Sequence, residues 1–187
     1  MDTDSPRIAP LPPEERDERT EELLRSLRRQ PDGPDLNIFA TLARHPRLLK
    51  RWSAFGGTLL YRGELSARDR ELLILRTAAN CGADYEWGQH AIIGVDAGLT
   101  PDEVRRCADP LEDAGWGDED AVLLRAADEL HEAARIGDTT WTALAARYTD
   151  AQLLELCMVV GQYHLVAFTL NSAGVQREPG VEGLPHD

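Results

Sequence analysis

Cysteine is scarce in this sequence. Its 187 residues include only Cys81, Cys107 and Cys157, and no two of them form a CxxC pair. Such an odd, sparse set does not support a disulfide framework, and the chain does not open with an apolar signal sequence. We therefore expect a reducing compartment, the cytoplasm.

Basic residues and uninterrupted apolar runs are also few. The chain has 20 lysines and arginines but 33 aspartates and glutamates, which gives a net charge of −13. This excess argues against nucleic acid or a membrane surface as a partner, because both are polyanions. The longest apolar run, residues 153–170, is interrupted by Glu155, Gln162 and His164. We expect it to form a buried helix and not a membrane span, since polar residues are costly in lipid.

Common cofactor and nucleophile motifs are absent too. The sequence has no GxGxxG after a strand, no GxxxxGK[ST] loop and no GxSxG elbow. These absences argue against a dinucleotide-dependent enzyme and against a hydrolase of the Ser-His-Asp type. We expect no cofactor.

Strand patterns are missing, whereas helical patterns fill the chain. No run keeps up the alternation that is typical of strands, so we predict an all-α protein. Ser66 and Thr100 are expected to cap two of its helices, and Asn37 a third. The expected helices cover residues 14–30, 37–45, 47–61, 66–80, 83–97, 100–109, 118–135, 138–148 and 149–173.

The pattern divides the chain into three parts. Residues 1–34 are expected to form an N-terminal arm and a first helix, residues 35–175 one helical domain, and residues 176–187 a flexible tail. The length suits a single domain with a sizeable core. The run LLIL, residues 72–75, is apolar on all sides, so the helix over residues 66–80 is expected to be central.

The segment NCGADYEWGQH, residues 80–90, combines several reactive side chains. On a helix, Glu86 and His90 are four residues apart and share one face. A carboxylate beside an imidazole orients the ring for acid–base work near neutral pH. An exposed ion pair would have the same spacing, but the neighbours Tyr85, Trp87 and the AIIGV run favour a buried site.

Glu71 is the second acid–base candidate. A hairpin of its helix with the next one would bring it beside Glu86 and His90. Two carboxylates in one site push their pKa values apart, so that one can stay protonated and act as an acid. The alternative is a solvent-facing glutamate paired with Arg68 or Arg70.

Five further residues are candidates for substrate binding. Tyr85 and Trp87 flank the glutamate of this segment and could shape a pocket. Tyr163, His164 and Asn171 lie on one long helix, from which each could reach the same pocket. Singly, each of them is equally compatible with a structural role.

Neither a metal site nor a redox thiol is predicted. Zinc needs three or four convergent ligands. Glu86 and His90 could offer two and His131 or His164 a third, but the segments around these two histidines lack the paired spacing of known zinc motifs. Cys81 lies near a helix end with no second cysteine close in sequence. We interpret it, like Cys107 and Cys157, as a small apolar filler.

The stretch RDRELLILRTAANCGADYEWGQHAIIGVDAGLTPDEV, residues 68–104, resembles the carboxymuconolactone decarboxylase family, which includes the AhpD-like proteins. The similarity extends over residues 35–175. It implies an all-α AhpD-like fold of about eight helices with a helical hairpin at the site. It also implies a homo-oligomer, such as a dimer, trimer or hexamer.

In the peroxidase-type members of this family, a glutamate precedes a CxxC and then a histidine. Glu71 and His90 match the glutamate and the histidine, whereas Ala83 and Glu86 stand where the two cysteines would be. Disulfide cycling needs an attacking and a resolving thiol. The sequence therefore resembles the decarboxylase-like branch, which lacks the CxxC.

These observations predict a cofactor-independent, decarboxylase-like enzyme for a small carboxylate- or lactone-bearing molecule. After loss of CO₂, His90, supported by Glu86, would protonate the carbanion, and Glu71 would share a proton or orient the substrate. An isomerisation or a related proton transfer would need the same side chains. Two alternatives remain: a hydroperoxide reductase that uses Cys81 alone, and a non-catalytic small-molecule-binding protein on the same scaffold.

Overall fold

The computed structural model describes residues 5–185, and the regular structure in this part of the chain is entirely helical. The prediction of an all-α protein is confirmed. A single 3-10 turn, η1, comes first. The elements are η1 (Pro13–Glu15), α1 (Glu18–Leu27), α2 (Asn37–Leu42), α3 (Pro46–Tyr61), α4 (Ala67–Asn80), α5 (Asp84–Asp96), α6 (Pro101–Arg106), α7 (Asp118–Ala133), α8 (Asp138–Ala145) and α9 (Asp150–Ala173).

Local capping signals set several helix ends. The hydroxyl oxygens of Ser66 and Thr100 accept hydrogen bonds from backbone N–H groups at the starts of α4 and α6, as predicted. The prediction for Asn37 is wrong: α2 starts at this residue, and Leu36 is its N-cap. The physical reason is tertiary, because the Asn37 backbone N–H donates to the side chain of Glu178 and does not need a local cap.

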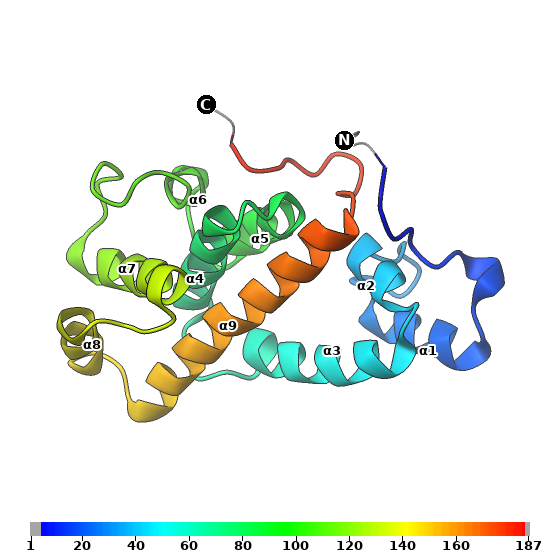
Figure 1. Cartoon of the computed structure of the whole chain (residues 1–187), viewed down its shortest axis with the longest axis horizontal. Helices are drawn as coiled ribbons and strands as arrows, with labels where there is room; N and C mark the ends of the chain where they lie inside the picture. Colours follow the sequence, from blue (N-terminus) through cyan, green and yellow to red (C-terminus); the bar gives the residue numbers. More distant parts are fainter. Residues whose placement is uncertain (1–4, 186–187) are drawn as a thin grey trace.

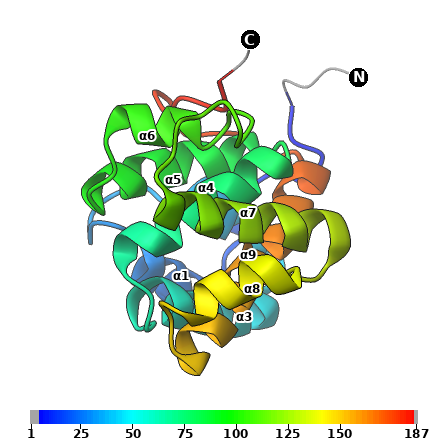
Figure 2. The ribbon, with the colours of Figure 1, turned by 90° about the vertical axis from the view of Figure 1, so that its left-hand side faces the viewer.

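Helix α4 is the centre of the molecule. It packs against α5, α7 and α9 (Figure 1), and Figure 2 presents the same packing from the side of α7 and α8. The side chains of Leu72, Leu73, Ile74 and Leu75 are completely buried, as the apolar run predicts. A helix that is apolar on every side can be stable in water only when other helices surround it.

Helix α9 crosses the molecule diagonally in Figure 1, with α4, α5 and α7 on one side of it and α1 to α3 on the other. Its length and composition would allow it to cross a membrane. Half of its most apolar window is nevertheless buried against other helices of the protein. This burial agrees with the expected core helix, which passes the same test of length and composition.

The C-terminal segment corrects the expectation of a loose tail. Within residues 176–185, Arg177 pairs with Asp84 at 2.6 Å, and the Leu184 N–H donates to the same carboxylate at 2.8 Å. Gly88 permits this close approach, because a Cβ there would lie 2.5 Å from the carbonyl oxygen of Glu182. Residues 1–4 and 186–187, the ends of the expected arm and tail, lie outside the described residues.

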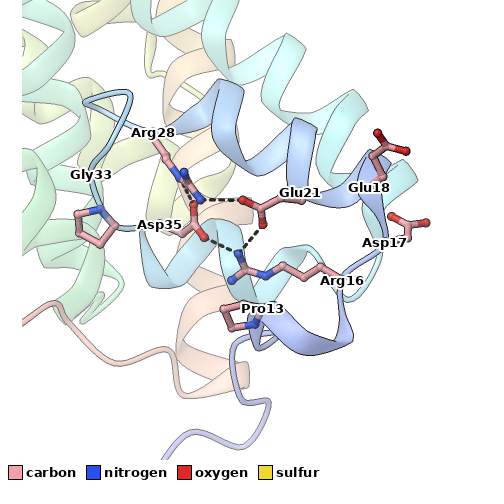
Figure 3. A pocket seen from close by; sticks show the side chains of 9 residues that line it. Pro13, Arg16, Asp17, Glu18, Glu21, Arg28, Gly33 and Asp35 are labelled. Atoms are coloured by element: carbon pink, nitrogen blue, oxygen red, sulfur yellow. Dashed lines mark hydrogen bonds and ion pairs between the residues drawn. The ribbon is translucent and has the colours of Figure 1, made fainter.

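A polar hollow near the N-terminus is closed by its own ion pairs (Figure 3). Arg16 contacts both Glu21 and Asp35, and Arg28 contacts the same two carboxylates, at distances of 2.6–3.0 Å. Because both arginines already have partners of the opposite charge, we assign this hollow the structural role of joining α1 to the loop before α2.

The Arg76 side chain yields a stability prediction. It forms a two-pronged ion pair with Asp128 of α7, at 2.6 and 2.9 Å, and also donates to the carbonyl oxygens of Cys107 and Asp109. Removing one partner of a buried pair leaves the other charge uncompensated, so Arg76→Ala should lower the free energy of unfolding by about 3–5 kcal/mol. Urea denaturation measures this change. The matched control is Arg125→Ala, at an exposed position on α7, and equal losses in the two variants would contradict the prediction.

Candidate functional site

The α4–α5 hairpin brings two of the predicted catalytic residues into contact. Residues 81–83 form its turn, in which Gly82 has a φ of +57° that favours glycine. The His90 Nδ1 lies 2.6 Å from Oε2 of Glu71, and both residues are buried. With the carboxylate as acceptor, Nδ1 carries the proton, and Nε2 is the ring nitrogen left for a substrate.

An adjacent arginine compensates the buried charge of Glu71. The carboxylate is completely inaccessible to solvent, and its Oε1 lies 3.2 Å from Nε of Arg70. The sequence left two interpretations of Glu71 open, a site residue or a partner of a neighbouring arginine. In the structure, Glu71 contacts both His90 and Arg70. The order Arg70–Glu71–His90 fixes the imidazole ring by a chain of charge-assisted hydrogen bonds.

Glu86 is placed differently from the expectation that it supports His90. Its side chain is buried, and neither carboxylate oxygen has a hydrogen-bond partner among the described residues. Burial without a compensating charge raises the pKa of Glu86 well above 4.5. Glu71 and not Glu86 orients the histidine, and Glu86 holds a proton under conditions in which an exposed glutamate is ionised.

A cavity of about 390 Å³ adjoins these groups. Its wall is mostly apolar and comes from α1, α2, α3, α5 and α9, so it lies where the N-terminal helices meet α9. Among the predicted site residues, Tyr85, Glu86, His90 and Tyr163 line it. A largely apolar pocket with a few convergent polar groups is the usual form of a small-molecule site.

Tyr163 presents its ring to the histidine. The rings of Tyr163 and His90 meet edge to face, with centroids 4.8 Å apart and planes at 85°. Burial, followed by the carboxylates of Glu71 and Glu86, raises the pKa of Tyr163 well above 10. The phenol therefore stays neutral and can act only as a hydrogen-bonding group and a wall of the cavity.

Three of the predicted substrate-binding residues lie elsewhere. Trp87 is 3% exposed and belongs to the main apolar core. His164 contacts His131, and the exposed Asn171 donates from Nδ2 to the carbonyl oxygen of Cys81 at 3.0 Å. None of the three lines the cavity. Helical spacing alone did not decide which neighbour each of these side chains contacts. In the packed structure, they lie on helix faces that do not border the cavity.

Groups that the sequence patterns did not indicate also surround the cavity: Arg29 and Gln89 line it, and Glu178 contacts two residues of its wall. The carboxylate of Glu178 accepts hydrogen bonds from the Tyr85 hydroxyl, at 2.7 Å, and from the Gln89 side-chain amide. The exposed Arg29 donates to Oε1 of Gln89 at 2.7 Å. These residues are up to 149 positions apart (Arg29 to Glu178), so no local motif could have joined them.

A second cluster was missed for the same reason. The Sγ of Cys81, Nδ1 of His131 and Nε2 of His164 all lie within 4.8 Å of one another. None of the three residues lines the cavity. Burial, and then the charge of Glu86, raises the pKa of the Cys81 thiol to about 11, which opposes a role as a free thiolate nucleophile.

Comparison with protein families agrees with this architecture. Residues 46–129 match the model of the Carboxymuconolactone decarboxylase family. The resemblance predicted from the sequence is thereby confirmed, and the matched segment includes both helices of the hairpin. No curated protein matches the chain.

Solved structures with the same fold are numerous but distant in sequence. An AhpD-core, peroxidase-related protein from Ralstonia eutropha JMP134 has a TM-score of 0.76 at 19% identity, with 90% of this chain and 87% of that one covered. A peroxidase-related protein from Silicibacter sp. TM1040 has a TM-score of 0.77 at 17% identity, with 95% and 92% covered. The debrominase Bmp8, in complex with 2,3,4-tribromopyrrole, has a TM-score of 0.72 at 15% identity, with 95% of each chain covered. At these identities the likeness establishes the shared AhpD-like helical fold.

The buried Glu86 yields a prediction for stability against pH. Because its pKa is raised in the folded protein, the folded state keeps a proton that the unfolded chain releases above about pH 4.5. Its contribution to stability is present below that pH and is lost as the pH rises toward the raised pKa. Glu86→Gln lacks this titration. From pH 4.5 to 8, the free energy of unfolding of the variant should therefore increase relative to that of the wild type, by up to about 1.4 kcal/mol per pH unit.

Urea denaturation of both proteins across that pH range measures the gap, that is, the free energy of unfolding of the variant minus that of the wild type. The control is Glu22→Gln, at an exposed position on α1, for which we expect a gap that does not change with pH. A gap for Glu86→Gln that is equally flat would show that Glu86 is ionised in the folded protein.

Proposed function

We propose that this protein is a cofactor-independent acid–base enzyme, decarboxylase-like in its chemistry, that acts on a small carboxylate- or lactone-bearing molecule. The match to the Carboxymuconolactone decarboxylase family and the fold shared with a debrominase support a small-molecule enzyme on this scaffold. The observation that carries the proposal is that one cavity is lined both by a histidine that a carboxylate orients and by a buried glutamate without a hydrogen-bond partner among the described residues.

The two carboxylates have different tasks in this proposal. Glu71 does not line the cavity and acts through His90, whose ring it holds in one tautomer. Glu86 lines the cavity and carries a proton, so it serves as the general acid. In a decarboxylation, the C–C bond to the carboxylate breaks, CO₂ leaves, and Glu86 delivers its proton to the resulting carbanion. Solvent then returns a proton to Glu86.

His90 widens the chemistry to other proton transfers. Its Nε2 can remove a proton from a carbon next to a carbonyl group, and a neutral Glu86 can donate one to the oxygen or carbon that becomes negative. Such a pair would catalyse isomerisation of a lactone as readily as decarboxylation. Positioning in the apolar cavity supplies the remainder of the rate enhancement.

Charge at the cavity favours an acidic substrate. Arg28 is neutralised by Glu21 and Asp35, but the partner of Arg29 is the uncharged amide of Gln89. The exposed Arg29 guanidinium therefore offers a positive charge at the edge of a cavity in a protein of net charge −13. It would attract and orient a carboxylate group.

Turnover of γ-carboxymuconolactone and related lactone acids tests the proposal. His90→Gln and Glu86→Gln should each lower kcat by about 10²–10⁴-fold, the usual contribution of general acid–base catalysis. Glu71→Gln should lower kcat with little change in KM, because its side chain does not contact the cavity. In D₂O, the wild type should place one solvent deuteron on the product carbon.

The matched control is His45→Gln, an exposed histidine outside the cavity, which should leave the rate unchanged. Full activity in the His90 and Glu86 variants would remove both residues from the mechanism. Thermal stabilisation by these acids without turnover would favour the non-catalytic binding protein instead.

We also propose that the protein works as a homo-oligomer assembled through α9. The outer face of this helix exposes Leu154, Met158, Leu165 and Phe168 by 50–69%, and a continuous apolar stripe of this kind usually marks an interface. Met158→Glu should shift the mass measured by light scattering toward that of the monomer, because the interface would bury an unpaired charge. Thr139→Glu, exposed on α8, should not. Equal masses for the wild type and Met158→Glu would contradict this assembly.

A further inference from the structure

Three potential metal ligands meet at a point outside the cavity, and they come from three different helices. Cys81 is the C-cap residue of α4, His131 lies in the last turn of α7, and His164 lies in the middle of α9. The Nδ1 of His131 is 2.9 Å from Nε2 of His164 and 3.9 Å from Sγ of Cys81. We propose that these three side chains form a binding site for Zn²⁺.

The spacing of the three donor atoms agrees with one tetrahedral ion. With Zn–N bonds of about 2.0–2.1 Å and a Zn–S bond of about 2.3 Å, two nitrogen ligands lie roughly 3.3 Å apart, and a nitrogen and a sulfur roughly 3.6 Å apart. The observed N···N separation of 2.9 Å is about 0.4 Å shorter than its ideal value, the observed N···S separation of 3.9 Å is about 0.3 Å longer, and no pair exceeds 4.8 Å. Adjustments of roughly an ångström in side-chain torsions complete the set.

The supporting contacts aim the donor atoms at this point. The Nδ1–H of His164 donates to the carbonyl oxygen of Val160 at 2.8 Å, which leaves Nε2 with its lone pair toward the cluster. The Asn171 side chain donates to the carbonyl oxygen of Cys81 at 3.0 Å and holds the turn that carries the thiol. Outer hydrogen bonds of this kind fix the tautomer and the direction of metal ligands.

The donor set and its accessibility select the ion. Two imidazoles and one thiolate form a borderline-soft N₂S set, which suits Zn²⁺ better than Mg²⁺ or Ca²⁺. His131 is exposed, whereas Cys81 and His164 are half-buried, so an ion can enter from solvent and keep a fourth position for water. The Phe168 ring packs edge to face against the His164 ring, with centroids 5.9 Å apart.

Zinc at this point would connect the central helices. Helices α4, α7 and α9 each supply one ligand, and the ion would cross-link them at the start of the α4–α5 turn. The same turn leads into Glu86 and His90 on α5. Because only the folded chain presents the three donors together, binding would add to the stability of the fold.

Metal titration of the full chain tests the site. The protein is treated with EDTA and a phosphine reductant, dialysed, and titrated with Co²⁺ as a spectroscopic probe and with Zn²⁺ in competition with a chromophoric chelator. We expect one equivalent of either ion per chain, a thiolate-to-cobalt charge-transfer band and a rise in Tm with Zn²⁺. Cys81→Ser should abolish the charge-transfer band, and His131→Gln should weaken Zn²⁺ binding by at least about tenfold.

Two matched variants control for unspecific binding. Cys157→Ser changes another half-buried cysteine, and His45→Gln another exposed histidine; both should bind Zn²⁺ and Co²⁺ as the wild type does. Far-UV circular dichroism of each metal-free variant checks that its helices are formed. His131→Gln changes an exposed side chain, so it provides a folded test even where Cys81→Ser does not fold. Less than stoichiometric binding by the wild type, or wild-type affinity in the folded His131 variant, would overturn the proposal.

Discussion

The hydrogen bond between Glu71 and His90 is the interaction on which the site depends. A completely buried carboxylate is tolerated only when opposite charge and hydrogen bonds compensate for the lost water. Arg70 and His90 provide this compensation, at 3.2 and 2.6 Å. Because the partners lie on α4 and α5, the bond also fixes how far the two helices of the hairpin can slide or turn against each other.

Glu86 is also a carboxyl group buried away from water, but its surroundings differ from those of Glu71. It is nearly as deeply buried as Glu71, but no side chain within residues 5–185 donates a hydrogen bond to its carboxylate, and its pKa rises instead. The two glutamates of this hairpin therefore differ in their surroundings: Glu71 contacts Arg70 and His90, whereas burial raises the pKa of Glu86.

The hairpin was the part of the molecule that the sequence predicted best. The Ser66 cap, the apolar run before Arg76 and the separation between Glu71 and His90 are local features, and local backbone geometry turns them into two antiparallel helices with little freedom. The choice of partner for His90 was predicted less well. A spacing of four residues puts Glu86 on the same helical face, but it does not tell which of two carboxylates the imidazole ring will meet.

The features missed from the sequence join distant parts of the chain. The C-terminal segment was expected to be a loose tail because its composition is polar. In the structure, Glu178 accepts hydrogen bonds from Tyr85 and Gln89, and it also takes the place of a local cap at Asn37. Trp87, His164 and Asn171 were expected at the cavity because helical spacing places residues on a face. Which neighbour covers each face depends on the packing of other helices around it.

The sequence by itself determined the all-α class, the course of α4 and α5, the resemblance to the Carboxymuconolactone decarboxylase family and the three residues around which its chemistry was expected. Periodicity, capping and a short motif act over a few residues, so they can be read along the chain. Only the tertiary structure decided that Glu71 holds His90, that burial raises the pKa of Glu86, and that Cys81 meets His131 and His164. These outcomes depend on burial and on contacts between helices, which are determined only when the whole core has packed.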